Sequence, residues 1–525
     1  MNLTDTIDKG WALHADRVCL LPADGSDAWT YRDVGEMTHR IAVGLSRLGV
    51  GHGDRVGVLS ANHPLAFIAM LAVLRADAVY VPLNPSSTAH ELGPLMETTR
   101  TRTLLYDPAL ISKMESLRAA VPHEVLTIRL HPGATDHPDR VLDEILAPPG
   151  TRAPEPSAGS EDPAWMAGTG GTTGQPKAVV IPHRALMTQT YGFLAHLPEA
   201  HPIQLAAAPL THAAGALTLP VLMQGGTTVI HRGVDVATIM ADIERYQITR
   251  LFLPPTAIYS MLAHPELEQH DFSSLKYFLY GAAPMSAEKL TEARRAFGPV
   301  MTQFFGQSEV PMLCTLMSPQ DHEEAFEDPA KAGRLASAGR ESLVARVAIL
   351  DRDGHRLPPG EVGEIAIRSD LRMTGYLDAP GETASVDRGN GWHGTSDLGR
   401  MDEDGFVYIV DRARDMIITG GFNVYPSEVE RVLLSMPQVR DCAVIGVPHD
   451  HWGEAVTAFV EPVERADVDP DALVAACKEV LGSVKAPKRV IVRELPKSPV
   501  GKVLKKELRA EYWAGRVRQV GGAVE

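Results

Sequence analysis

The sequence predicts an α/β fold: a large N-terminal domain of parallel or mixed sheets flanked by helices, with a β subdomain, and a small mobile α+β domain at the C-terminal end. The first observation behind this prediction is an alternation near the N-terminus. Strand-like residues 56–59 and 79–83 flank a longer apolar segment, residues 65–74, with the sequence LAFIAMLAVL. A short β-branched strand, a helix and a second strand in this order are typical of a parallel sheet.

The second observation is that the same alternation recurs further along the chain. Strands are predicted at residues 227–230, 250–253 and 277–280, and the last two end at Pro254 and Gly281. The apolar segment described above is far shorter than the roughly 18 residues that would cross a membrane, so a buried helix is expected there.

Changes in amino-acid composition and in the pattern of strands and turns divide the rest of the chain into segments. Residues 131–163 are rich in Pro, Gly, Ala and Asp, which predicts a long exposed connection. From residue 340 onward, short strands with Asp-Gly turns indicate an antiparallel β subdomain. The C-terminal part has a small α+β pattern of its own, with a strand expected at 442–447 and a helix at 471–481.

Composition excludes several classes of protein. The chain has 525 residues, 50 basic and 66 acidic side chains and 44% hydrophobic residues, the balance of a folded soluble protein. The formal net charge of −16 and the lack of a basic run argue against nucleic acid as a partner. The four cysteines are far apart, so they are expected to be buried apolar residues and not metal ligands. No secretory signal is visible, which predicts a cytoplasmic location.

The most informative segment is a glycine-rich loop, residues 168–177, with the sequence GTGGTTGQPK. Backbone N–H groups of such a loop can close on an anion, and threonine hydroxyls add further donors. Lys177 adds a positive charge that can meet triphosphate oxygens. The loop matches neither the Walker pattern nor Gly-x-Gly-x-x-Gly, and on composition alone a flexible surface loop stays open beside a phosphate site.

The ordered ending Thr-Thr-Gly-x-Pro-Lys resembles the phosphate-binding motif of the adenylate-forming (ANL) superfamily, which contains the acyl-CoA synthetases, or AMP-dependent synthetases and ligases. The chain departs from the family pattern at Gly170, where serine is usual, and at Ala178, where glycine is usual. The resemblance continues in order along nearly the whole chain. It implies a large domain at residues 1–411, holding the ATP and acid sites, and a small lid at residues 412–525.

The same resemblance implies contacts to ATP. Phe305 would stack on adenine, Ser308 would donate to the α-phosphate, and Glu309 is a hard oxygen ligand suited to Mg²⁺. Asp397 would accept hydrogen bonds from the ribose, although Ser396 replaces the usual glycine of the Thr-Gly-Asp motif. The full set implied for nucleotide and cofactor binding is Thr169, Gly170, Gly171, Thr172, Thr173, Gly174, Lys177, Gly281, Ala282, Ala283, Gln303, Phe304, Phe305, Gly306, Ser308, Asp397, Arg412, Lys502, Gly420, Gly421 and Trp452.

The C-terminal motifs imply a domain rotation. Arg414 matches the hinge about which the small domain turns between two poses. Gly420 and Gly421 resemble the loop that lines the pantetheine channel, along which Trp452 would pack. Lys502 matches the catalytic lysine of the terminal Pro-x-x-x-x-Gly-Lys pattern, which would bridge the carboxylate and the α-phosphate as negative charge builds.

The acid pocket is implied in the same way. Gly306 stands where acetate-specific relatives have a tryptophan, which leaves room for more than two carbons, and Phe304 and Tyr280 make a wide, deep tunnel less expected. A medium-sized acid is therefore predicted: aromatic, alicyclic or medium-chain. The pocket residues are His212, Gly215, Leu279, Tyr280, Gly281, Phe304 and Gly306, and the catalytic set is Lys502, Glu309, Lys177 and His212.

The resemblance thus implies ATP-dependent activation of a carboxylic acid to an acyl-AMP, with release of pyrophosphate, followed by transfer to CoA. The implied cofactors are ATP, Mg²⁺ and coenzyme A, and the implied partners are small molecules, with no nucleic acid and no transmembrane segment. A homodimer and a carrier-protein acceptor stay open. Two different functions also stay open: activation of an unusual acid such as nitrite, and a catalytically dead nucleotide-binding protein, which Gly170, Ala178 and Ser396 suggest.

Overall fold

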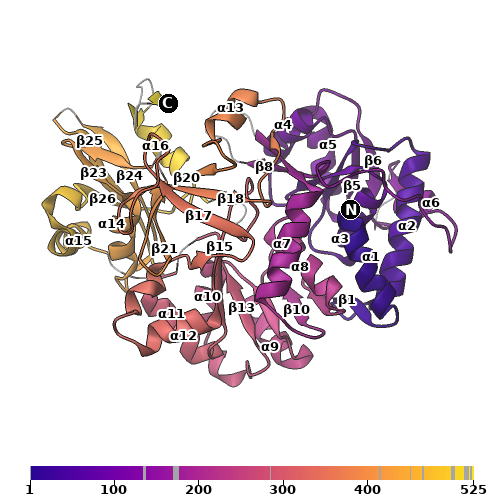
Figure 1. The fold of residues 1–525 in the computed structure, drawn as a ribbon, viewed down its shortest axis with the longest axis horizontal. Helices are drawn as coiled ribbons and strands as arrows, with labels where there is room; N and C mark the ends of the chain where they lie inside the picture. Colours follow the sequence, from indigo (N-terminus) through magenta and orange to yellow (C-terminus); the bar gives the residue numbers. More distant parts are fainter. Residues whose placement is uncertain are drawn as a thin grey trace.

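The fold of the chain is known from a computed structural model, shown in Figure 1 from the indigo N-terminal part to the yellow C-terminal part. The residues that the structure describes are 2–133, 138–169, 177–283, 285–412, 415–449, 451–463, 466, 468–497, 503–513, 519–520 and 523–524. They form sheets of nine, eight, four and five strands and one two-stranded pair. The α/β class predicted from the sequence is confirmed.

The nine-stranded sheet has the order β16-β15-β14-β13-β12-β10-β11-β1-β2. The neighbours from β14 to β1 pair in parallel, so their carboxyl ends share one edge. Three of these strands lie where the sequence predicts them. The bounds are β1 Val18–Pro22, β2 Trp29–Thr30, β10 Ile203–Ala206, β11 Thr227–Ile230, β12 Arg250–Phe252, β13 Tyr277–Tyr280, β14 Met301–Phe305, β15 Thr315–Met317 and β16 Arg340–Glu341.

The eight-stranded sheet has the order β19-β9-β8-β4-β3-β5-β6-β7. Its strands from β8 to β7 are parallel, whereas β9 runs antiparallel to both β8 and β19. The bounds are β3 Arg55–Leu59, β4 Val79–Leu83, β5 Thr103–Tyr106, β6 Leu126–Arg129, β7 Arg140–Val141, β8 Pro163–Thr169, β9 Lys177–Pro182 and β19 Gly375–Tyr376.

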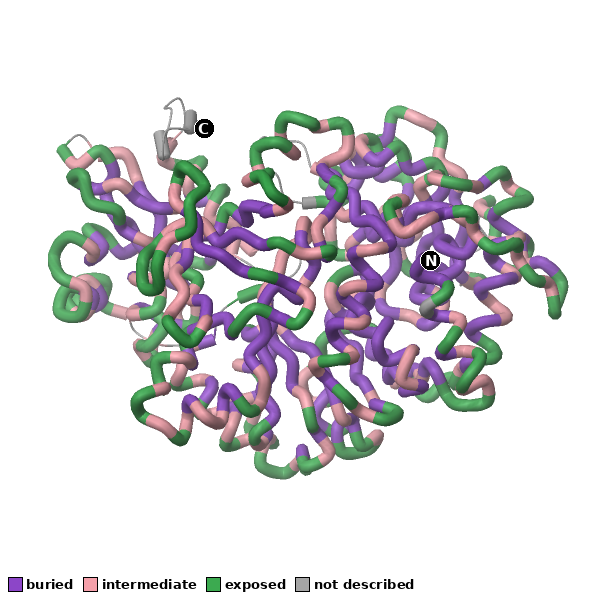
Figure 2. Tube along the Cα trace, in the orientation of Figure 1, coloured by how far each residue is buried: buried purple, intermediate pink, exposed green. Residues whose placement is uncertain are grey.

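Apolar helices fill the space between the two sheets, where Figure 2 shows the chain buried. The helix predicted at 65–74 is α3 (Pro64–Arg75), which contacts β3 and β4 of one sheet and β1 of the other. In the part of the chain that the structure describes, no helix has the length and apolar character needed to cross a membrane. The other helices of this region are α1 Leu3–His14, α2 Tyr31–Arg47, α4 Ala89–Thr99, η1 Pro108–Leu110, α5 Ile111–Ala120, α6 Leu142–Ile145, α7 His183–His196, α8 Ala213–Met223, α9 Val236–Tyr246, α10 Pro255–Leu262, η2 Leu267–Gln269, α11 Ala287–Phe297, α12 Pro319–Glu327 and η3 Ala332–Ala336.

The expectation of an exposed connection at residues 131–163 is wrong in its middle. Strand β7 pairs with β6, and helix α6 follows it. Leu142, Ile145 and Ala147 are buried there, and the Ala147 carbonyl accepts a hydrogen bond from Arg40 Nε at 2.8 Å. The helical spacing of the apolar residues therefore determines the structure of this short segment, although the sequence around it is rich in Pro and Gly.

The β subdomain is confirmed as an antiparallel sheet with the order β17-β18-β20-β21. Its strands are β17 Ala345–Leu350, β18 Gly363–Ser369, β20 His393–Met401 and β21 Val407–Arg412, and the short helix α13 (Pro380–Ser385) lies between β19 and β20 in the chain.

The C-terminal part has its own sheet and its own hydrophobic core. The predicted strand at 442–447 lies within β24 and the predicted helix at 471–481 within α15. The boundary that the sequence predicts between residues 411 and 412 falls before the last residue of β21 and stays a prediction. The elements are β22 Ile417–Thr419, β23 Phe422–Val424, α14 Pro426–Leu434, β24 Val439–His449, β25 Gly453–Pro462, α15 Pro470–Lys485, β26 Arg489–Val492, α16 Lys505–Trp513, β27 Gln519–Val520 and β28 Ala523–Val524.

The four cysteines are free and buried, as predicted. Burial raises the pKa of the thiols of Cys19, Cys314 and Cys442, and it raises the pKa of Cys477 to about 11.

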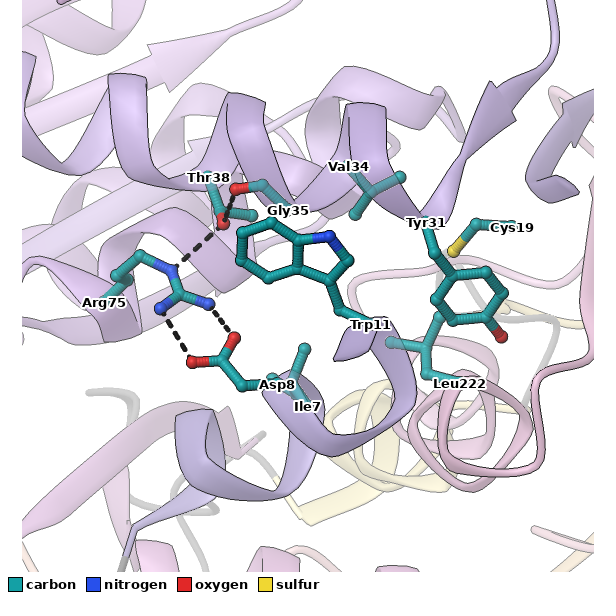
Figure 3. Close-up of a pocket in the computed structure, with 10 residues that line it drawn as sticks. All are labelled: Ile7, Asp8, Trp11, Cys19, Tyr31, Val34, Gly35, Thr38, Arg75 and Leu222. Atoms are coloured by element: carbon teal, nitrogen blue, oxygen red, sulfur yellow. Dashed lines mark hydrogen bonds and ion pairs between the residues drawn. The ribbon is translucent and has the colours of Figure 1, made fainter. Parts of the chain in front are cut away.

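Helix α1 is tied to α2 and α3 by the contacts drawn in Figure 3. Arg75 has a side chain only 5% exposed, and it donates to Thr38 Oγ1 and to the Asp8 carboxylate, each at 3.0 Å. The Trp11 indole lies against Gly35, where an added Cβ would be 2.3 Å from the ring. Glycine at this helical position is therefore required by the close approach of α1.

Replacing Gly35 with alanine is expected to lower the free energy of unfolding by about 1–3 kcal/mol, because overpacking outweighs the better helix propensity of alanine. Urea denaturation followed by circular dichroism measures this change. Gly51→Ala is the control, since a Cβ there meets nothing within 4 Å. Equal midpoints for the two variants would show that Trp11 moves aside without cost.

Candidate active site

Two of the predicted glycines lie at the carboxyl edge of the nine-stranded sheet. Gly281 follows β13, and a Cβ there would be 2.7 Å from the Phe304 carbonyl oxygen. Gly306 follows β14, and a Cβ there would be 2.4 Å from the Met312 backbone nitrogen. Backbone crowding requires glycine at both positions. Glycine at position 306 is therefore explained by the nearby Met312 backbone. It gives no information about the size of the acid that the pocket accepts.

The side chains of β13 and β14 divide between the two faces of the sheet. Leu279 and Phe304 belong to the core that lies between the two large sheets. The Phe304 ring contacts the rings of Phe193 and Phe252, with centroids 5.8 and 5.4 Å away. These two predicted pocket residues therefore lie on the same face.

Tyr280 lies on the opposite face, in a separate core cluster, which corrects its predicted place in the acid pocket. It is fully buried, and its hydroxyl donates to Gln303 Oε1 at 3.1 Å and lies 2.9 Å from His322 Nε2. Burial raises the pKa of Tyr280 and lowers the pKa of His322 to about 4, so both groups are neutral. Gln303 shares this face, so its side chain is part of the same buried network and does not point toward a nucleotide.

The loop from β10 to α8 carries His212. Asn62 holds this loop, because its Oδ1 accepts the Leu210 N–H at 2.8 Å. His212 precedes the first turn of α8 and is solvent-accessible, with Nδ1 3.0 Å from Thr211 Oγ1. Surrounding protein desolvates the imidazole and lowers its pKa, so it is neutral near pH 7. Gly215 is fixed by packing, since a Cβ there would be 1.9 Å from the Leu210 carbonyl oxygen.

Lys177 and Glu309 meet around one aromatic ring. Lys177 is the first residue of β9, and its Nζ lies 5.3 Å from the centroid of the Tyr376 ring. The Tyr376 hydroxyl donates to Glu309 Oε1 at 2.8 Å, and Lys177 Nζ is paired with Glu382 at 2.6 Å. Sequence reasoning did not identify Tyr376 or Glu382, because only the pairing of β19 with β9 brings them to the site.

The residues between β14 and Glu309 are partly exposed. Phe305 ends the strand, and Ser308 follows it in the loop. In the turn after β13, Ala282 and Ala283 are exposed, and Ala282 has a φ of 65°. These four residues therefore surround the same sheet edge as Glu309.

Asp397, predicted to contact ribose, lies opposite Arg412 in the pairing of β20 with β21, so it neighbours a second residue predicted to bind the nucleotide. Asp397 is 9% exposed, and its N–H donates to Thr395 Oγ1 at 3.1 Å. Ser396 has a φ of 60°, in the left-handed region. This backbone explains why glycine is usual at this position in the family that the sequence resembles.

Alanine at position 178, where the family usually has glycine, causes no backbone strain of the kind seen at Ser396. Ala178 is buried in β9 in register with Gly168, and its carbonyl accepts the Leu377 N–H at 2.9 Å. A side chain fits an ordinary strand position of this kind.

Gly420, Gly421 and Trp452 come together at one end of the C-terminal sheet. The two glycines have φ of 57° and 82° and form the tight turn between β22 and β23. The Gly420 N–H donates to the Trp452 carbonyl oxygen at 2.8 Å. The indole stacks on His449 with centroids 4.2 Å apart and is not part of the core.

Several predicted residues lie outside the described part of the chain. They are Gly170, Gly171, Thr172, Thr173, Gly174, the hinge residue Arg414 and the catalytic lysine Lys502; for Thr169 and Arg412 the description covers the backbone and not the side chain.

Comparisons with known proteins identify the family to which the chain belongs. Residues 7–377 match the AMP-binding enzyme family, and residues 428–502 match the AMP-binding enzyme C-terminal domain. A medium/long-chain-fatty-acid–CoA ligase of Mycobacterium tuberculosis is 37% identical over 512 residues, which cover 93% of this chain and 87% of the relative. A feruloyl-CoA synthase of an Amycolatopsis species is 34% identical over 493 residues, covering 93% and 95%.

A solved structure of an amide bond synthetase from Marinactinospora thermotolerans superposes with a TM-score of 0.87 at 29% identity, covering 98% of this chain and all of that one. The chain belongs to the AMP-binding enzyme family. It is an AMP-forming acid–thiol ligase, and its reaction uses ATP and CoA.

Ser396→Gly is expected to raise the free energy of unfolding by up to about 1 kcal/mol, because a left-handed backbone costs a non-glycine residue about 1–2 kcal/mol and the flexibility of unfolded glycine offsets part of the gain. Thermal or urea denaturation without ligands measures it. Ser435→Gly is the matched control, since φ there is −75° and a loss of stability is expected. Equal losses in both variants would contradict strain at Ser396.

Proposed function

We propose that the chain activates a medium-sized carboxylic acid at the carboxyl edge of the nine-stranded sheet and then transfers the acyl group to CoA. The observation that carries this proposal is the meeting of Lys177 and Glu309 around Tyr376, because it joins the strand after the glycine-rich loop to the strand end predicted to face the phosphates. Asp397 beside Arg412 supports a ribose site nearby.

In the first half-reaction, a carboxylate oxygen of the acid attacks the α-phosphorus of ATP and pyrophosphate leaves. Lys177 and Lys502 are proposed to offset the negative charge that builds on the phosphate oxygens during this attack. Ser308 is proposed to donate a hydrogen bond to the α-phosphate. Together these groups are proposed to hold the reactants in line, which would remove much of the entropic barrier.

Glu309 is proposed to hold Mg²⁺. Its carboxylate is partly exposed and accepts one hydrogen bond from Tyr376, and a carboxylate has about four lone-pair sites, so the donor chemistry fits a hard cation. When bound, the ion neutralises charge on the triphosphate.

In the second half-reaction, the CoA thiol attacks the acyl carbon and AMP leaves. Rotation of residues 412–525 about Arg414 is proposed to bring Gly420, Gly421 and Trp452 to the acyl-adenylate. Support comes from the way the glycine turn and the indole lie together at one end of the C-terminal sheet. His212, neutral and solvent-accessible beside the first turn of α8, is proposed to face the acyl group.

The proposed acid is aromatic, alicyclic or a medium-chain fatty acid. Relatives whose names specify ferulate and medium or long fatty acids support a substrate larger than acetate. The bulk of Leu279 and Phe304 on one face of the sheet supports a limit on its length.

A panel of acids tests the substrate range. With Mg·ATP and CoA, pyrophosphate release is expected to be at least tenfold faster, in kcat/KM, with a phenylpropenoic or medium-chain acid than with acetate or palmitate. Preference for acetate or palmitate contradicts the proposed range. Transfer to a phosphopantetheinyl protein but not to free CoA would instead favour a carrier protein as the acceptor.

Lys502→Ala is expected to lower acid-dependent ATP–pyrophosphate exchange by about a hundredfold or more, the loss typical of one group that stabilises a transition state. The same variant is expected to keep thioester formation from a supplied acyl-adenylate. Lys331→Ala is the control, because Lys331 pairs with Glu324 on the surface and is expected to affect neither step. Equal loss of both steps in Lys502→Ala contradicts the assigned role.

A further inference from the structure

We propose that Tyr376 is a positioning residue that sets Glu309 and Lys177 for the triphosphate, and that Glu382 is the counter-ion that the triphosphate displaces from Lys177. This inference rests on the proposed function, because it takes Glu309 as the Mg²⁺ ligand and Lys177 as a phosphate contact.

The backbone of Tyr376 is fixed to the strand that carries Lys177. Tyr376 pairs with Val179 in the antiparallel pairing of β19 with β9. The Tyr376 N–H also donates to Thr383 Oγ1 at 2.9 Å. The Tyr376 backbone is therefore fixed beside β9, the strand that begins at Lys177.

The side chain of Tyr376 reaches across to the other large sheet. Its hydroxyl donates to Glu309 Oε1 at 2.8 Å, and the Met373 N–H donates to the Glu309 carbonyl oxygen at the same distance. A tyrosine phenol carries one O–H donor, and here it is directed at the Glu309 carboxylate. A carboxylate held by such a charge-assisted bond has its other lone pairs in fixed directions.

The same ring supports Lys177. Lys177 Nζ lies over the Tyr376 ring and is paired with Glu382 on α13 at 2.6 Å. The side chains of Lys177 and Glu382 are 24% and 43% exposed, so water screens the pair and its contribution is small. A triphosphate carries several negative charges and competes well with one such carboxylate. Glu382 thus keeps Lys177 in place before ATP binds and is exchanged for phosphate oxygens.

Tyr376→Phe tests the positioning role, because it removes the hydroxyl and keeps the ring beneath Lys177. The Mg²⁺ concentration that gives half-maximal ATP–pyrophosphate exchange is expected to rise about tenfold, the smaller of the losses typical when a partner of a metal ligand is removed. Mn²⁺ binding to the ATP complex, measured by electron paramagnetic resonance without any acid, is expected to weaken by a similar factor.

Tyr408→Phe is the matched control. It removes a similar bond, from the Tyr408 hydroxyl to Asp402 Oδ2 at 2.9 Å, in a ring that also has a cation over it, Arg400. Tyr408 lies in the β subdomain and is expected to leave both metal measurements unchanged. A double variant, Glu309→Gln with Tyr376→Phe, is expected to bind Mn²⁺ no more weakly than Glu309→Gln alone, since Tyr376 acts through Glu309.

Glu382→Gln tests the counter-ion role. Because Lys177 loses its competing carboxylate, KM for Mg·ATP is expected to fall about threefold while kcat changes less than twofold. Glu324→Gln, which weakens the surface pair with Lys331 at 3.2 Å, is the control and is expected to change neither constant. A KM that is unchanged or raised in Glu382→Gln overturns the counter-ion role.

The tests separate this inference from the proposed function. If the wild-type chain shows no acid-dependent exchange with any acid of the panel, the proposed function fails. If the wild type shows exchange while Tyr376→Phe leaves the Mg²⁺ midpoint and the Mn²⁺ affinity unchanged, the positioning role alone is overturned.

Discussion

The burial of helix α3 between the two large sheets is the constraint on which the rest of the structure depends. Nearly all of its side chains are buried, and it contacts β3 and β4 on one side and β1 on the other. Removing this much apolar surface from water holds the sheets at a fixed separation. Residues at the edges of different sheets can therefore take part in one site, as Glu309 and Tyr376 do.

The charges of the site are arranged locally and do not follow the charge of the whole molecule. The chain carries a net charge of −16, yet ATP is also an anion. Lys177 forms an ion pair with the carboxylate of Glu382, and Glu309 accepts a hydrogen bond from the uncharged phenol of Tyr376. Such short-range arrangements decide the local field, because water and salt screen the distant surface acids.

Much of the fold could be predicted from the sequence, because long segments with a clear period determine their own structure. The buried helix at 65–74 and the strands at 227–230 and 277–280 are examples. The structure in the middle of residues 131–163 could not be predicted, because its few apolar residues are surrounded by Pro-rich and Gly-rich sequence. The pairing of the two-residue strand β19 depends on residues nearly two hundred positions away, so neither Tyr376 nor Glu382 carried a sequence signal.

The error at Tyr280 has a different origin. Motif resemblance placed Leu279 and Tyr280 together in one pocket, whereas successive side chains of a strand point to opposite faces. The alternation of residues 277–280 already indicates that one of these neighbours must face away from the acid. Strand geometry applied to the motif therefore separates the two side chains on sequence grounds alone.

The four buried cysteines have a consequence for an enzyme whose second substrate is a thiol. None of them is accessible, and burial raises the pKa of each, so thiolate is scarce at neutral pH. Burial and the raised pKa values therefore disfavour attack of a cysteine of the chain on the activated acyl group in competition with CoA. The same burial shields the four thiols from disulfide exchange with oxidised CoA.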